Sequence, residues 1–274
     1  AVSALALLPL VGSFSLPSLA PRGQRHRCKP VRPLNLQIGD VDVPHARDSL
    51  YAKTLEGVSW PSEWPYSEQE LRPMDSSPDG FFYVIPKFVH HASEECRRSL
   101  ADYYQCVLPA SGTGSVLDLC SSWTSHYPEG WRGGRCVALG LNPLELMANP
   151  SKTEWTLQDL NQRPVLEEPD ASFDVVTCSL SVDYLRRPLE VMTEVHRVLK
   201  PGGLACMAFT NRCFPTKVVP IWLNPFEDRS HIRIVGEYFH FSADWEDISV
   251  ADVTPSARQQ QQDPMYIVQA RKRS

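Results

Sequence analysis

The stretch from Val116 to His126, VLDLCSSWTSH, combines an apolar run with small polar side chains and a histidine. An apolar strand that ends in a polar loop is typical of domains that hold a nucleotide-type cofactor at the carboxyl ends of their strands. This loop, however, contains no glycine. The sequence therefore leaves two alternatives here: an altered loop that still binds a cofactor, or a loop that no longer binds one.

Other side chains capable of chemistry follow two later apolar runs. Asp183 and Tyr184 come soon after FDVVTCS, and Asn211, Arg212 and Cys213 directly follow LACMAF. The carboxyl ends of parallel strands meet at one edge of a sheet, so these groups are expected to lie near the loop that contains His126. No GxGxxG follows any apolar run, which argues against a dehydrogenase. No CxxC or zinc-type Cys/His spacing occurs, so no metal site is predicted.

Composition narrows the class of protein. The chain has 274 residues and is 42% hydrophobic, enough to bury a core. Several of its eight cysteines lie inside apolar runs such as GGRCVALGL, which predicts reduced, buried thiols. The net charge is −5, with basic residues concentrated in the first 33 positions. An acidic body gives no electrostatic footprint for nucleic acid, so no nucleic-acid partner is expected.

The N-terminal segment, residues 1–35, is predicted to be a targeting presequence. AVSALALLPLVG is too short an apolar run to span a bilayer, and a Ser-, Pro- and Arg-rich stretch without acids follows it. This order resembles the two-part presequences of algae with complex plastids. It favours a plastid (chloroplast) location over the mitochondrion or cytoplasm, and no stable membrane insertion is expected. A disordered or mistranslated extension is the alternative.

Residues 36–80 show neither helical nor strand periodicity, and they are predicted to form an irregular extension that Trp60 and Trp64 anchor by packing. From residue 81 the pattern becomes regular. Short apolar runs predict strands at 115–119, 136–141, 155–158, 173–179 and 204–209, and spacings of three and four predict helices at 92–108 and 188–200. PGG at 201–203 is expected to end the second helix. The runs at 245–253 and 265–270 predict an antiparallel strand pair.

Continuous apolar strands that alternate with helices indicate an α/β fold in which helices cover both faces of a mostly parallel sheet. Three segments then carry a family resemblance: VLDL, QDLNQRPVLEEPDASFDVV and LSVDYLRRPLEVMTEVHRVLKPGG. They resemble class I S-adenosylmethionine-dependent methyltransferases of the small-molecule type, over about residues 81–274. The resemblance implies a Rossmann-like seven-stranded sheet that ends in an antiparallel pair. SSWTSH and NRCFPTK also resemble a little-characterised bacterial and plastid subgroup.

The resemblance implies a set of cofactor-binding positions. Asp159 and Leu160 match the adenine-binding pair, and Asn142 lies nearest the position that normally supplies an acid to the ribose. The glycines of the usual loop are replaced by Cys120, Ser122 and Thr124, whose small side chains allow a close approach but make any positive φ strained. The remaining implied positions are Leu119, Trp123, Ser179 and Asp118. Asp118 is alternatively explained as a strand-end cap. Gly and Pro residues between 121 and 134 predict that the usual following helix is short or absent.

Acceptor-side candidates are His126, Tyr184, Asn211 and Arg212. His126 is either a base or a structural hydrogen-bond partner, and Arg212 is either a carboxylate or phosphate clamp or a surface arginine that caps the next helix. The sequence thus predicts S-adenosylmethionine-dependent methyl transfer to a small-molecule acceptor, without a metal. The alternative is an inactive methyltransferase-like fold that serves as a binding or assembly subunit, for which a protein partner is expected.

Overall fold

The computed structural model describes residues 37–38, 41–42, 46, 48–255 and 263–274. The predicted presequence, 1–35, and the glutamine tract at 259–262 lie outside these residues, so plastid targeting stays a prediction. The strands are β1 (Gln37–Ile38), β2 (Val41–Asp42), β3 (Ser115–Ser121), β4 (Arg135–Gly140), β5 (Glu154–Leu157), β6 (Phe173–Ser179), β7 (Leu199–Phe209), β8 (Trp245–Asp252) and β9 (Tyr266–Lys272). The helices are α1 (Asp79–Phe82), α2 (Glu94–Val107), α3 (Pro143–Ala148), α4 (Pro188–Val198), α5 (Pro220–Leu223) and α6 (Asp228–Ser242), with a 3-10 turn, η1, at Val182–Tyr184.

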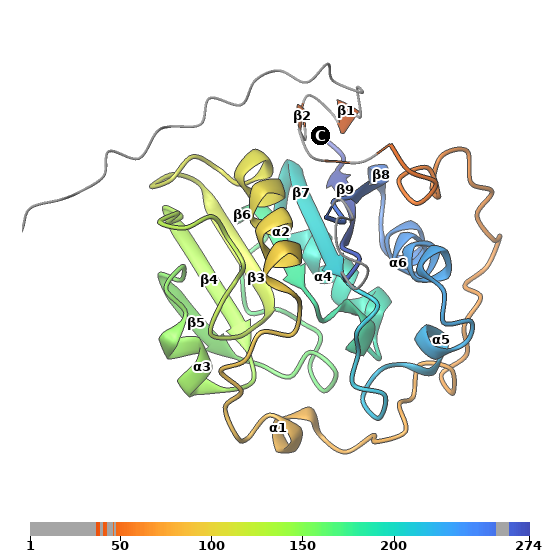
Figure 1. Cartoon of the computed structure of the whole chain (residues 1–274), viewed down its shortest axis with the longest axis horizontal. Helices are drawn as coiled ribbons and strands as arrows, with labels where there is room; N and C mark the ends of the chain where they lie inside the picture. Colours follow the sequence, from red (N-terminus) through yellow and green to blue (C-terminus); the bar gives the residue numbers. More distant parts are fainter. Residues whose placement is uncertain (1–36, 39–40, 43–45, 47, 256–262) are drawn as a thin grey trace, which may run out of the picture. The chain divides into compact units, whose positions relative to one another are not determined.

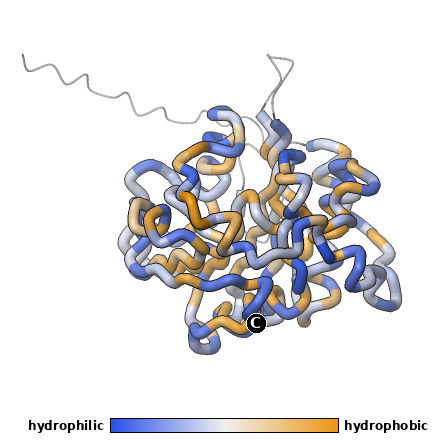
Figure 2. Tube along the Cα trace, turned by 90° about the horizontal axis from the view of Figure 1, so that it is seen from below, coloured by the Kyte–Doolittle hydropathy of each residue, from blue (hydrophilic) through white to orange (hydrophobic). Residues whose placement is uncertain are grey.

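Seven strands form one sheet in the order β5-β4-β3-β6-β7-β9-β8. The first five are parallel, whereas β9 runs antiparallel to both β7 and β8. Figure 1 shows α2 in front of this sheet. In Figure 2 the hydrophobic, orange stretches cross the interior and the hydrophilic ones lie mainly on the outer turns. The predicted Rossmann-like sheet with an antiparallel C-terminal pair is confirmed.

Two hydrophobic clusters cover the two faces of the sheet. On one face α2 contributes Cys96, Leu100, Tyr103 and Tyr104, which lie one turn apart or side by side on its buried stripe. Its first turn is capped by Ser93, whose hydroxyl accepts a hydrogen bond from the amide of Cys96. On the other face α4 and α6 pack against the sheet. The predicted arrangement, with helices on both faces, is confirmed.

The end of α4 differs from the prediction. The helix ends at Val198, not at 200, and Pro201, Gly202 and Gly203 lie within β7 instead of merely stopping the helix. Leu199 is fully buried and pairs with Phe173, and the next pair in the register is Val175 with Leu204. Leu199 is therefore buried in the sheet, and α4 does not continue for another turn. Gly202 and Gly203 form an irregularity inside the strand.

The segment before α2 covers the molecule without regular structure between residues 48 and 78. Trp60 stacks on His240 of α6, with ring centroids 5.1 Å apart, and Trp64 packs on Tyr238 of the same helix. The predicted packing role of both tryptophans is confirmed. Within the residues that the structure describes, no helix has the length and apolar character needed to cross a membrane.

Candidate functional site

A cavity of about 370 Å³ opens at the carboxyl ends of β3, β4, β5, β6 and β7. Its outer wall is the segment from α1 to residue 91, which lies beneath that edge of the sheet in Figure 1. The cavity brings together nearly all the site residues predicted from the sequence: Asp118, Leu119, Cys120, Ser122, Trp123, His126, Asn142, Asp159, Leu160, Ser179, Tyr184 and Arg212. Asn211 is not among its lining residues.

The end of β3 and the loop that follows it contain left-handed backbone at residues other than glycine. Cys120 has a φ of +51°, in the left-handed region that glycine tolerates and other residues adopt at a cost. His126 in the same loop and Leu180 after β6 also have φ near +60° and line the cavity. Each such residue costs about 1–3 kcal/mol and persists where the surroundings impose it, often at functional sites.

We expect Cys120→Val to lower the free energy of unfolding by about 2 kcal/mol more than Cys120→Gly, because a β-branched side chain suits positive φ least. Chemical denaturation measures both values. Cys136→Val is the matched control: Cys136 is fully buried in β4 without a positive φ, and a conservative swap there should cost under about 1.5 kcal/mol. Equal losses for Cys120→Val and Cys120→Gly would show that the backbone at this position is not strained.

No helix follows this loop between residues 122 and 134, as the sequence predicted. Aromatic side chains fill the space instead. The hydroxyl of Tyr127 lies 2.6 Å from that of Thr177 in β6, and the indole of Trp131 donates to the carbonyl of Pro109. The two rings contact each other edge to face. The loop is therefore held by packing and hydrogen bonds to the sheet, at the place where the resemblance would imply a helix.

Asp118 is a buried link between strands. It is 1% exposed, and its carboxylate accepts hydrogen bonds from Ser121 (2.6 Å) and from Thr177 in β6 (2.9 Å). Burial raises the pKa of Asp118 to about 6, against the opposing effect of these hydrogen bonds. Asp118 lies within β3, not at its end, and its carboxylate joins β3 to β6.

Asn142, after β4, is fully occupied by contacts within the protein. As the N-cap of α3 its side-chain oxygen accepts from the amides of Leu144 and Glu145, and its NH₂ group donates to the carbonyls of Tyr83 and Val84. An asparagine side chain offers two donors and an acceptor with two lone pairs, so all four positions are used. Asn142 therefore fastens the outer wall to α3.

Glu145 is a cavity residue that the sequence reasoning missed. It is 6% exposed, and its two carboxylate oxygens accept from the amide of Lys87 and from the hydroxyl of Ser122, both at 2.6 Å. Asn142 followed by Pro143 is a helix-start signal that would have placed Glu145 in a first turn beside the loop. A carboxylate therefore does stand after β4, three residues beyond the position matched in the sequence.

Asp159 follows β5 and is partly exposed in the cavity. One carboxylate oxygen accepts from the amide of Asn161 at 2.9 Å, and the other accepts from the side chain of Gln162 at 2.7 Å. Because a carboxylate offers about four lone pairs, each oxygen can still accept a further hydrogen bond. Leu160 beside it is 4% exposed and belongs to the core.

The acceptor-side candidates differ in what they can do. Tyr184 accepts a hydrogen bond from the amide of Phe214, and burial together with Asp183 raises its pKa, so it remains a phenol. Burial lowers the pKa of His126 to about 4, with Arg97 adding to the effect, so the ring is neutral at pH 7 and a weak base. Arg212 donates from Nε to Asp263 at 2.6 Å and is 61% exposed, which leaves its outer nitrogens at the cavity rim.

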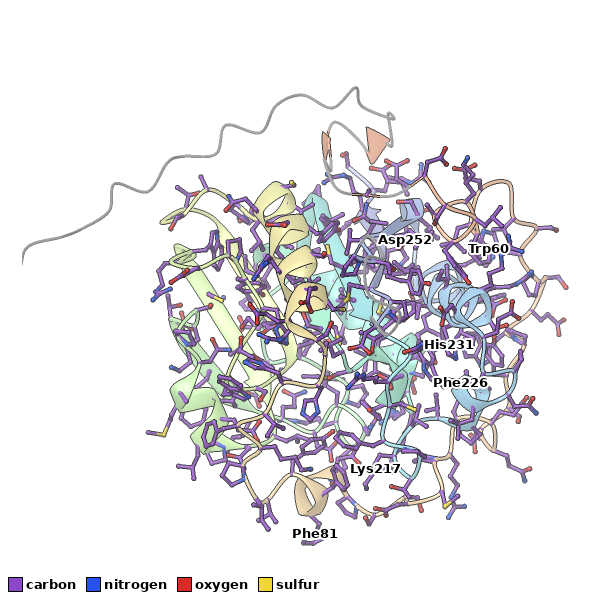
Figure 3. All side chains as sticks on the ribbon, viewed as in Figure 1. Trp60, Phe81, Lys217, Phe226, His231 and Asp252 are labelled. Atoms are coloured by element: carbon purple, nitrogen blue, oxygen red, sulfur yellow. The ribbon has the colours of Figure 1, made fainter. Side chains whose placement is uncertain are left out.

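The outer wall is tied to the sheet by buried ion pairs. Lys217, from the NRCFPTK segment, is 2% exposed and lies 3.1 Å from both Asp75 and Asp79. Asp79 also pairs with Arg186 and accepts a hydrogen bond from the side-chain NH₂ group of Asn161. Figure 3 shows Lys217 inside the molecule, whereas Phe81 of α1 points away from it. Nothing in the described chain gathers three or more metal-ligating side chains.

Comparison with known proteins agrees with this architecture. A family model described as "Methyltransferase domain" matches residues 110–207. A ubiquinone/menaquinone biosynthesis C-methyltransferase from Rubrivivax gelatinosus is 27% identical over 146 residues, which cover 51% of this chain and 48% of that protein. A biotin biosynthesis bifunctional protein from Teredinibacter turnerae is 35% identical over 86 residues, 31% of this chain and 13% of that protein. The chain thus spans about half or less of these curated relatives.

Among solved structures, an S-adenosylmethionine-dependent methyltransferase from Mesorhizobium loti aligns with a TM-score of 0.42 and 17% identity, over 61% of this chain and 95% of that one. The family match covers β3, β4, β5, β6 and most of β7, the strands whose ends form the cavity. The part of the chain that forms the cavity is therefore similar to a methyltransferase domain, and its strand order is that of a Rossmann-like sheet.

Proposed function

We propose that this protein transfers the methyl group of S-adenosylmethionine to a small-molecule acceptor. One observation carries the proposal: the site residues implied by the resemblance, all but Asn211, line a single cavity at the carboxyl ends of the strands. Ligands of open α/β sheets bind at that edge. We further propose that the chain belongs to the subgroup with SSWTSH and NRCFPTK, because both segments contribute residues that line the cavity.

The residues present fit this cofactor. The backbone at Cys120 adopts the conformation that a loop glycine would supply. Gly140 at the end of β4 lies so close to the carbonyl of Ser121 that a side chain would collide with it, which keeps this corner of the cavity open. Asp159 would accept from the adenine amino group, and Glu145, in place of Asn142, would offer a carboxylate to the ribose side. Ser179 would face the methionine side.

S-adenosylmethionine supplies an already activated methyl group, so the protein must mainly hold the acceptor in line and exclude water. His126 and Tyr184 can position the acceptor by hydrogen bonds, but neither is a strong base near pH 7. A base is needed only when the acceptor must lose a proton first. We therefore expect an acceptor that reaches the cavity with its nucleophilic atom already deprotonated or uncharged.

Calorimetric titration with S-adenosylmethionine and S-adenosylhomocysteine tests the proposal. Both should bind, and Asp159→Ala should reduce the affinity at least about tenfold, because the adenine loses a charged acceptor. Asp102→Ala, on the exposed face of α2, is the control and should bind like wild type. Thermal melting of each variant shows that it is folded.

The alternative is an inactive methyltransferase-like subunit. It is favoured by the full occupation of Asn142 and by the strained, glycine-free loop at Cys120. Failure of the wild-type chain to bind either compound at millimolar concentration would select this alternative. Binding that Asp159→Ala leaves unchanged would instead show that the adenine lies elsewhere.

A further inference from the structure

Hydrogen-bond partners are distributed unevenly between the acids and the cations of the cavity. Each lining carboxylate has at least two partners from the protein: Asp79, Asp118, Glu145 and Asp159. Lys217 is equally occupied, with two acids and the carbonyl of Ser77 around its ammonium group. The acids of the cavity therefore already have hydrogen-bond partners from the protein.

Two other cations of the cavity, Lys87 and Arg212, keep free donors. Within the described chain, the ammonium group of Lys87 donates one hydrogen bond, to the carbonyl of Phe82, and Arg212 uses only its Nε. The ring nitrogens of His90 and His91 have no hydrogen-bond partner among the described residues, and both side chains line the cavity. Burial lowers the pKa of His91, and the charge of Lys87 adds to that effect.

Rings surround these donors. Phe214 lies 5.5 Å from His91 and 5.4 Å from the ammonium nitrogen of Lys87, measured to ring centroids. On the loop after β3, Trp123 lies 4.6 Å from His90. Flat, apolar walls beside free cationic donors suit a planar ligand that carries a negative group.

From this arrangement we infer that the acceptor is a small, planar, anionic molecule whose carboxylate or phosphate group is bound by Lys87 and Arg212. The inference rests on the proposed function, because it names the substrate class of the same cavity. Lys87 and Arg212 come from opposite sides of the cavity, the outer wall and the loop after β7. They would hold the anion while the rings of Trp123 and Phe214 contact the planar body.

Fluorine NMR titration tests this with three probes of one shape: para-fluorobenzoate, para-fluorophenyl phosphate and the neutral para-fluorobenzamide. Each is titrated into the full chain with and without saturating S-adenosylhomocysteine. At least one of the two anions should bind at least about tenfold more tightly than the amide. Whichever anion binds more tightly shows whether the carboxylate or the phosphate is the group recognised. Equal binding of the amide and both anions would overturn the inference.

Variants link the effect to the two side chains. Lys87→Met and Arg212→Met should each weaken the favoured anion about tenfold, equivalent to about 1.4 kcal/mol, without weakening the amide. Lys87→Arg should retain binding, which separates loss of charge from disturbance of the wall. Arg98→Met, on the exposed surface of α2, is the control. Unchanged anion affinity in both Met variants would overturn the assignment.

The experiment distinguishes failure of the proposed methyl transfer from failure of the inferred anion site. If S-adenosylhomocysteine does not bind but the anion still depends on Lys87 and Arg212, the proposed methyl transfer fails and the anion site stands. If S-adenosylhomocysteine binds and the anions show no preference over the amide, the proposed function stands and the inferred substrate class is wrong.

Discussion

Replacing Lys217 by methionine should destabilise the folded chain by about 3 kcal/mol. The ammonium group is buried beside Asp79, which is itself largely buried, whereas Asp75 is partly exposed; removing one partner of a buried ion pair typically costs about 3–5 kcal/mol. Arg186 remains beside Asp79, so the loss should lie at the lower end of that range. Urea unfolding followed by tryptophan fluorescence measures it.

Lys53→Met provides the control for this experiment. Lys53 pairs with Asp48 at the surface, where ion pairs contribute little to stability. A loss below about 1 kcal/mol for Lys217→Met would show that the outer wall of the cavity is not held by this contact. The same variant should expose residues 75–91 to proteolysis, because Lys217 binds the start of that segment.

Asp183 should make stability fall as the pH rises from about 4 to about 8. Its side chain is 3% exposed, one carboxyl oxygen has no hydrogen-bond partner among the described residues, and burial raises its pKa to about 8. In that interval the folded chain keeps the proton, whereas the unfolded chain, with a pKa near 3.8, loses it. The folded state therefore binds more protons, and its stability declines by up to about 1.4 kcal/mol per pH unit.

Asp183→Asn isolates this effect because an amide does not ionise. The free energy of unfolding of the variant minus that of wild type should be lowest near pH 4. It should increase by up to about 1.4 kcal/mol per pH unit, and so by several kcal/mol, as the pH approaches 8. Chemical denaturation across this pH range gives the difference, and Asp102→Asn on the surface of α2 should show no such trend. A difference between Asp183→Asn and wild type that stays constant with pH would contradict a buried, protonated Asp183.

The sheet was predictable because its strands are short, continuous apolar runs, which stand out in the sequence.

Helix α6 was missed for a physical reason. Its buried residues, from His231 to Phe239, surround most of the helix, because the irregular segment with Leu55 and Trp60 covers the face turned away from the sheet. A helix buried on two sides lacks the single apolar stripe that marks an amphipathic one.

The cavity residues on strand ends were predictable by the same logic, since the topology of a parallel sheet brings them to one edge. Lys87 and Glu145 were not, because their positions depend on how the segment from α1 to residue 91 folds back onto α3. Asn211 shows the opposite limit. Asn211 directly precedes Arg212 after β7, yet only Arg212 lines the cavity. Position after a strand does not determine which way a side chain points.

A crystal structure of the chain grown with S-adenosylhomocysteine tests the central claim most directly, namely that the glycine-free loop still forms a cofactor site. The account predicts the adenine beside Asp159 and Leu160, with the loop at Cys120 keeping its left-handed backbone against the ligand. A ligand bound at another surface, or a cavity closed to the ligand at saturating concentration, would contradict it.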